Sequence, residues 1–191
     1  MTLRSAFCSV LVLCISAAAN ATQTDLPIQM DVLNRLAAAS DYAALKSAYR
    51  HIKYTDSVVR LAYALRCSEL RPGKDSERQL IEAMPRSREE LYRFCGLARP
   101  DSQPNPFARY AAGGLFEPMA KAVVAQRKGL VEFLRLSSLA DGELKVQLDA
   151  WTCFVRRADP KAYGKALGHL SEAERRYVPD DCDAPKAKRA D

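Results

Sequence analysis

The sequence predicts an all-α fold made of short antiparallel helices. Apolar residues recur at spacings of three and four along nearly the whole chain, which is the period of a helix with one buried face. Sustained alternation of Val, Ile and Thr, which is typical of strands, is lacking. The spacing of the cysteines further predicts two related, disulfide-stapled lobes in an α-solenoid-like or helical-hairpin array. With 48% hydrophobic and 27% charged residues, the 191-residue chain has the composition of a globular protein.

Residues 1–21 have the features of a cleaved secretory signal peptide. A positively charged start precedes an apolar run over residues 6–19, which is too short to cross a bilayer comfortably. Residues 19–21, Ala-Asn-Ala, then supply the small residues of a cleavage site. Two alternatives remain: an uncleaved anchor, and a lipoprotein attached at Cys14, which Leu13 fits poorly. Cleavage leaves 191 − 21 = 170 residues, periplasmic or secreted, without a stable membrane anchor.

Residues 22–98 are predicted to form an N-terminal helical lobe. Each expected helix begins at a residue that suits a helix start, either a proline in the first turn or a polar side chain that can cap the backbone amides. The last of them opens with the S-x-x-E pattern of a capping box. The predicted starts are Pro27, Ser40, Thr55, Asp75 or Ser76, and Ser87.

A Pro/Gly-rich linker is predicted over residues 99–118, because this segment contains a Gly-Gly pair and several prolines but no clean periodicity. Residues 119–182 are then expected to form a C-terminal helical lobe. Its helix starts include Asp159, which is followed by proline, and Ser171, which opens a second capping box. Residues 183–191 form a polar tail.

The two lobes show signs of an internal duplication. An offset of 86 residues aligns segment 45–67 with segment 131–153 without a gap, although unrelated helical sequences also match weakly. The mature chain keeps four cysteines, and an even number in an exported protein favours disulfides. The offset places Cys67 on Cys153, and each is followed by a further cysteine 28 or 29 residues later. Of three possible connectivities, Cys67–Cys95 and Cys153–Cys182 are therefore expected.

The residue types that carry catalysis form no recognisable constellation. His51 and His169 both lie near predicted helix ends, where the helix dipole explains a histidine without catalysis. A nucleophile motif and closely spaced metal-binding cysteines are lacking, so the sequence predicts no catalytic residue, no metal and no cofactor. The basic residues are scattered among acidic ones, which does not favour a nucleic-acid partner.

One cluster in the linker has the residue types of a binding hot spot. Phe107, Arg109, Tyr110 and Phe116 combine aromatic rings with an arginine on a proline-rich segment. These residues are predicted to contact a partner. The alternative is that the aromatic rings fold back and fill the space between the lobes.

The expected function is therefore a non-enzymatic binding protein of the cell envelope. A stapled helical scaffold without catalytic residues suits a protein that neutralises or inhibits another exported protein, such as a toxin immunity protein or an inhibitor of a hydrolase. The alternative is a cell-envelope hydrolase that uses paired carboxylates. For that alternative the candidates are Glu117 and Glu143 beside loop breaks, Glu89 with Glu90, Glu172 with Glu174, and the aspartates Asp180, Asp181 and Asp183.

Overall fold

A computed structural model describes residues 26–50, 56–97 and 107–182. The predicted signal peptide (1–21), the polar tail (183–191), His51, Thr55 and residues 99–106 of the predicted linker lie outside the described residues. Within the described ranges the protein is mostly helical and contains no strand. The predicted all-α class is therefore confirmed.

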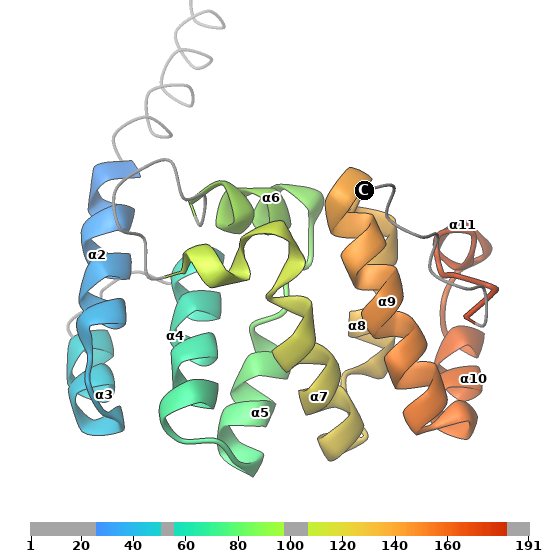
Figure 1. Cartoon of the computed structure of the whole chain (residues 1–191), viewed down its shortest axis with the longest axis horizontal. Coiled ribbons are helices and arrows are strands. Elements are labelled where there is room, and N and C mark those ends of the chain that lie inside the picture. The colour runs from blue at the N-terminus through green and yellow to red at the C-terminus, as the bar shows by residue number, and fades with distance from the viewer. Residues whose placement is uncertain (1–25, 51–55, 98–106, 183–191) are drawn as a thin grey trace, which may run out of the picture.

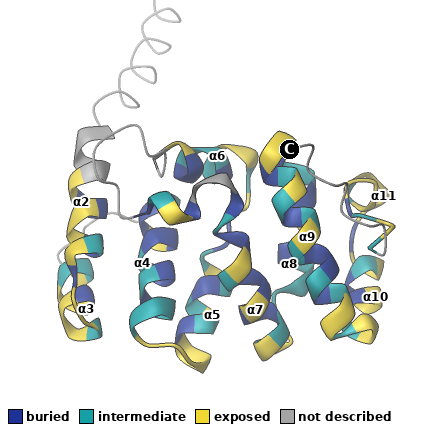
Figure 2. Ribbon diagram, viewed as in Figure 1, coloured by how far each residue is buried: buried dark blue, intermediate teal, exposed yellow. Residues whose placement is uncertain are grey.

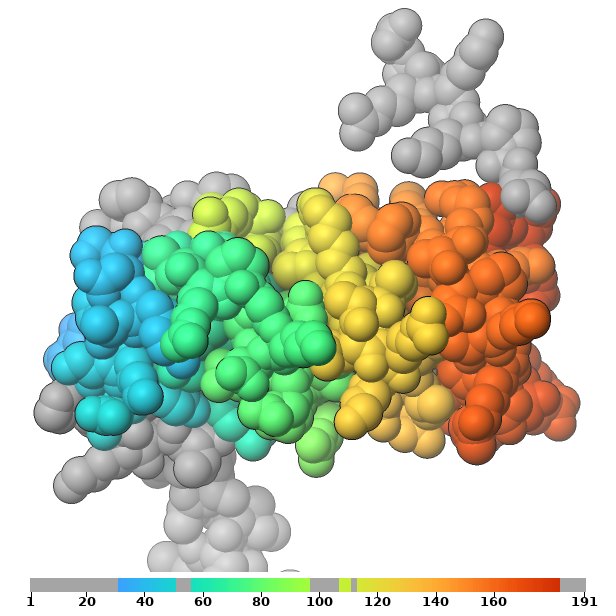
Figure 3. Space-filling view, turned by 90° about the horizontal axis from the view of Figure 1, so that it is seen from below, coloured from blue at the N-terminus to red at the C-terminus, as the bar shows by residue number. Residues whose placement is uncertain are grey.

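The helices follow one another along the long axis of the molecule in nearly the order of the chain, from α2 and α3 at one end to α10 and α11 at the other (Figure 1). Seen from below, successive segments form adjoining bands along the surface (Figure 3). The elements are α2 (Leu26–Ala38), α3 (Tyr42–Arg50), α4 (Ser57–Leu70), α5 (Lys74–Glu82), α6 (Arg88–Leu97), the 3-10 helix η1 (Ala108–Gly113), α7 (Phe116–Gln126), α8 (Leu130–Leu139), α9 (Gly142–Ala158), α10 (Pro160–Gly168) and α11 (Glu172–Arg175).

A single apolar core runs through the whole array. The longer helices turn an apolar stripe inward and leave an exposed outer face (Figure 2), whereas the single turn α11 has no buried residue. Leu36 of α2, Leu65 of α4 and Leu148 of α9 are all fully buried members of this core. Since the core is continuous from α2 to Val178, the halves on either side of the predicted linker share their buried surface.

Two of the predicted helix caps, Asp159 and Ser171, are present in the structure as expected. Asp159 accepts a hydrogen bond from the amide of Ala162 at 3.0 Å, and Ser171 forms a complete capping box with Glu174. The cap of α3 is Asp41 rather than the predicted Ser40, because the Asp41 carboxylate accepts from an amide of the first turn at 2.8 Å. Asp56 caps the start of α4 in the same way, through its side-chain carboxylate.

Three more predicted starts can be compared with the structure. The helix α5 begins at Lys74, after Gly73, and so starts one or two residues before the predicted position. Before α6 the capping box is incomplete: Ser87 accepts from the amide of Glu90 at 3.2 Å, but the Glu90 carboxylate accepts from the amide of Arg86 instead. Pro27 lies within the first turn of α2, as expected.

The offset of 86 residues also relates the helices themselves. Shifted by 86, the bounds of α5 (74–82) fall on those of α10 (160–168). Shifted in the same way, α4 (57–70) falls inside α9 (142–158). The register of the helices therefore agrees with the alignment of the sequence.

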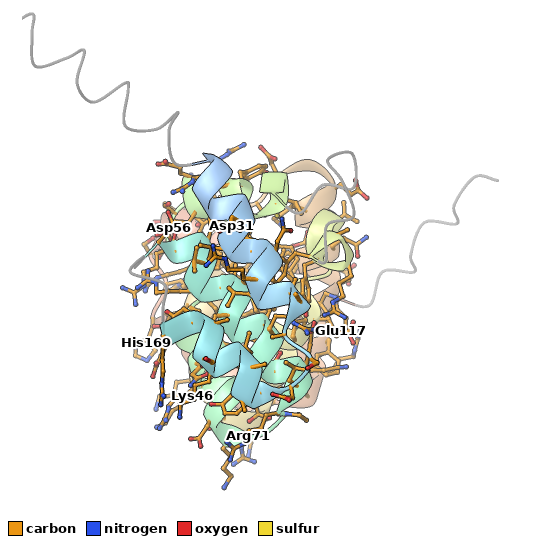
Figure 4. The ribbon with its side chains drawn as sticks, turned by 90° about the vertical axis from the view of Figure 1, so that its left-hand side faces the viewer. Asp31, Lys46, Asp56, Arg71, Glu117 and His169 are labelled. Carbon is orange, nitrogen blue, oxygen red and sulfur yellow. A yellow bond between two sulfur atoms is a disulfide. The ribbon has the colours of Figure 1, made fainter. Side chains whose placement is uncertain are left out.

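The disulfide prediction is half right. Cys153 of α9 is joined to Cys182, which lies beyond α11. Cys67 and Cys95 are both buried, but no disulfide joins them. The helix α4 descends from Asp56 to Arg71 (Figure 4), while α6 lies at the upper end (Figure 1), where Arg93 pairs with Asp56 at 2.8 Å. Cys67 is eleven residues, about 16 Å, further along α4 and thus lies away from α6.

Candidate binding groove

The aromatic residues predicted to contact a partner belong to the core. Phe107, Tyr110 and Phe116 are buried, with exposed fractions of 1%, 6% and 0%. Phe107 lies edge-on to the ring of Phe94 in α6, so the segment folds back onto the helices. Three of the four predicted contact residues therefore do not reach the surface. Removing their rings from water stabilises the fold, whereas leaving the rings exposed would not. Only Arg109 is exposed, and its guanidinium pairs with Glu69 of α4.

A groove of about 410 Å³ lies where the two halves of the array meet. One wall comes from the end of α5 and the turn that follows it, and the other from α8 and α11. The apolar residues of its lining are Ile81, Met84, Pro85 and Leu139, and the polar ones are Arg86, Glu132, Arg135, Ser138 and Glu174. Its volume lies within the range of ligand sites, which often form between structural units.

Gly129 allows the walls to approach this closely. It has a φ of +71°, which favours glycine, and it starts α8 directly beside α5. A Cβ atom at this position would lie 2.3 Å from Cγ2 of Ile81, which is shorter than any real contact. The glycine therefore fixes the distance between α5 and α8 and with it the width of the groove.

A polar clamp holds one end of the groove. Asp141, which precedes α9, accepts hydrogen bonds from Arg88 and from the hydroxyl of Tyr92, both in α6. The amide of Asp141 also donates to the Tyr92 hydroxyl oxygen at 3.0 Å. Arg88 is two residues from Arg86 and Asp141 is two residues from Leu139, so the clamp joins the two walls directly beside the groove.

A second polar contact joins the halves between α5 and α7. The amide of the Gln126 side chain donates to the Glu77 carboxylate at 2.5 Å and to the carbonyl oxygen of Lys74 at 3.4 Å. Together with the clamp it fixes α7 and the α8–α9 turn to the first half. The groove is therefore a preformed feature of the described structure and needs no rearrangement to open.

The charges in the groove fall into one neutralised pair and two side chains without a partner. Arg135 donates through Nε to Glu174 at 3.1 Å. Hydrogen bonds from Ser171, together with the Arg135 charge, hold the pKa of Glu174 below its usual value. Arg86 and Glu132 are exposed, and their side chains form no hydrogen bond or ion pair within the described part of the chain.

The groove contains two carboxylates, and the one of Glu174 does not have the property of the acid in a two-carboxylate hydrolase. Such an enzyme needs one carboxyl that keeps its proton near neutral pH, which requires a raised pKa. The pKa of Glu174 is shifted the other way, so Glu174 is held ionised and is a poor general acid. Glu174 was predicted to act in a pair with Glu172, but the Glu172 carboxylate pairs with Arg176 at 3.0 Å instead.

The other residues considered as catalytic candidates do not line the groove. Glu117 pairs with Lys121 at 2.6 Å, and Glu143 is an exposed residue in the first turn of α9 that does not line the groove. His169 caps the end of α10 and projects on the opposite side of the molecule from Glu117 (Figure 4). Within the described ranges, no group of His, Cys, Asp and Glu side chains could hold a metal ion.

Apart from Glu174, the groove residues were not predicted as functional from the sequence. Glu132 and Arg135 are spaced three apart, which places them on one face of α8, and this pattern was visible in the sequence. Nothing local, however, indicates that this face lines the same groove as Arg86, 46 residues earlier, because that arrangement depends on the packing of α5 against α7 and of α7 against α8.

None of the helices in the described ranges is long and apolar enough to span a bilayer. The Cys153–Cys182 disulfide is compatible with an extracellular location. Comparison of the chain with models of protein families, with curated proteins and with solved structures found no match.

Proposed function

We propose that this protein is an exported, non-enzymatic binding protein that neutralises or inhibits another envelope or secreted protein, such as a toxin. The observation that carries the proposal is the groove between the halves, which exposes, beside apolar side chains, an arginine and a glutamate that have no partner within the described part of the chain. Leaving such charges unpaired contributes nothing to folding, whereas charges on a preformed surface select a partner and speed its association.

The architecture that we propose for this role is a pair of related lobes in an α-solenoid-like array. Its support is the agreement between the 86-residue offset of the sequence and the bounds of α5 and α10. Repeated helical units stack into extended surfaces, and such surfaces usually bind other proteins. In this arrangement the groove is the junction at which the second unit begins.

The proposed location is the periplasm or the extracellular space. The support for it is the sequence of residues 1–21 together with the disulfide that joins Cys153 to Cys182. Disulfides persist in oxidising compartments, where a partner protein that is itself exported would be encountered. A staple of this kind also keeps the binding surface folded outside the cell.

Affinity capture from periplasmic extract and culture medium tests the proposal. The bait is the wild-type protein, the groove variant Arg86→Glu/Glu132→Lys, or the matched control Arg60→Glu/Glu143→Lys, which makes the same charge changes at exposed positions outside the groove. We expect one exported protein to be retained by wild type and by the control but not by the groove variant. The captured protein, once purified, should lose activity when the wild type is added in stoichiometric amount.

Two results would count against the function. If no exported protein is retained by wild type, the binding role fails. If a protein is retained equally by all three baits, its binding does not use the groove. The unpaired charges of the groove then give no support to the proposed function. Melting curves of the three baits establish that both variants are folded before the comparison is made.

A further inference from the structure

We infer that the groove takes a segment of the partner protein in which an apolar side chain lies between an acidic and a basic one. This inference rests on the proposed function and specifies the chemistry that the same site recognises. It follows from three properties of the lining: an apolar floor, guanidinium groups with free donors, and one carboxylate without a partner.

The floor selects for an apolar side chain. Ile81 and Leu139 are partly buried against the core, and Met84 is 4% exposed, so the bottom of the groove is formed by apolar groups from both halves. Burying an aliphatic side chain here removes apolar surface of both the groove and the partner from water, which stabilises the complex. Methionine adapts its shape to different side chains more easily than branched residues do.

Arginine groups provide the anion-binding end. The guanidinium of Arg86 has no partner within the described ranges, and Arg135 uses Nε for Glu174, so that its two Nη groups are not engaged. A guanidinium binds a carboxylate with two parallel hydrogen bonds, which fixes the direction of the ligand as well as its charge. An acidic side chain of the partner therefore suits this end of the groove.

Glu132 provides the cation-binding group of the groove. Glu174 does not serve in this role because Ser171 and Arg135 already donate to its carboxylate, which leaves its charge balanced. Glu132 is exposed, faces the same groove and has no partner in the described structure, so its carboxylate repels a purely acidic ligand. A lysine or arginine of the partner relieves that repulsion, and the unpaired charges of the groove are then matched one to one.

A peptide titration tests the inference. The probe is the blocked peptide acetyl-Glu-Leu-Leu-Lys-amide, which presents the three groups without charged chain ends. Three further peptides each lack one feature, with Gln for Glu, Ser-Ser for Leu-Leu, or Gln for Lys. Binding to the purified protein is followed by the amide chemical shifts of the groove residues. We expect the complete peptide to bind and each altered peptide to bind at least about fivefold more weakly, the effect of losing one charge-assisted contact.

Variants of the protein then locate the binding. Arg86→Glu should weaken binding of the complete peptide about tenfold, whereas Arg60→Glu, at an exposed position outside the groove, should leave it unchanged. Glu132→Lys should weaken binding of the complete peptide and improve binding of the peptide acetyl-Glu-Leu-Leu-Glu-amide. This exchange of preference cannot result from partial unfolding, which would weaken both peptides.

The results that overturn the inference differ from those that overturn the function. Equal binding of all four peptides, no binding of any, or equal effects of Arg86→Glu and Arg60→Glu would refute the recognition chemistry. If groove-dependent capture of an exported protein still succeeds, the proposed function stands without this chemistry. If the peptides bind as expected but no exported protein is captured, the chemistry of the groove stands and the function fails.

Discussion

Removal of the Cys153–Cys182 disulfide should cost a large part of the stability of the protein. The bridge joins residues separated by 29 positions. For a loop of this length the chain-entropy model gives about 3 to 4 kcal/mol, because the crosslink restricts the unfolded chain. The double variant Cys153→Ser/Cys182→Ser should thus unfold with a free energy lower by that amount. For a domain of this size the melting temperature should fall by roughly 6 to 16 °C.

Urea denaturation followed by circular dichroism measures this difference. Wild type is compared with the double variant, each with and without a reducing agent. Reduction should destabilise wild type to the level of the variant and should leave the variant unchanged, because Cys67 and Cys95 are not bridged. The reasoning is refuted if the variant unfolds within about 1 kcal/mol of wild type. It is also refuted if the reducing agent destabilises the variant, since a second disulfide would then be present.

Three further predictions concern single positions. Gly114→Ala should lower the free energy of unfolding by about 1 to 3 kcal/mol in urea denaturation, because a Cβ atom there would lie 2.1 Å from a backbone carbonyl oxygen of η1. Gly164→Ala should raise it by about 0.5 to 1 kcal/mol, since Gly164 lies within α10 with nothing within 4 Å of the added atom; a loss of stability would contradict this. Glu174→Gln should be less stable than wild type at neutral pH. The pKa of Glu174 is lowered by folding, so its contribution is complete above the unfolded value near 4.5 and disappears as the pH falls through the folded value. The gap between the two stability curves should therefore close in acid, and a gap independent of pH would refute the assignment.

Local chemistry explains why so many elements were predictable from the sequence. The capping box at Ser171 and the cap at Asp159 need only a few neighbouring residues, and the structure contains both. The start of α3 was misplaced by one residue because Ser40 and Asp41 are both good caps, and the choice depends on which side chain reaches the first free amides.

The Cys67–Cys95 bridge was wrong because the two halves are not equivalent at their ends. In the second half α11 is a single turn of four residues, and the chain returns from it to α9, where Arg156 donates to the carbonyl oxygen of Asp180 at 2.8 Å. In the first half α6 has ten residues and lies against the start of α4. Equal spacing in the sequence therefore leads to different distances in space.

The functional surface was the least predictable part. Aromatic residues of the linker were predicted either to contact a partner or to fold back into the interior. The structure has the second arrangement, because the apolar core continues beneath the linker and Phe107 fills part of it. The groove could not be predicted, because Arg86 and Glu132 line one groove only after α5 has packed against α7 and α7 against α8. Charges that come together through tertiary packing leave no spacing that a sequence pattern can detect.

Photocrosslinking in the living cell tests the central claim, that the groove binds another exported protein. A photoreactive phenylalanine derivative replaces Ser138, which lines the groove, or Arg60, an exposed residue outside it. Irradiation should give a crosslinked product with one exported protein from position 138 but not from position 60, and Arg86→Glu should abolish it. No product from position 138, or the same product from both positions, would contradict the claim.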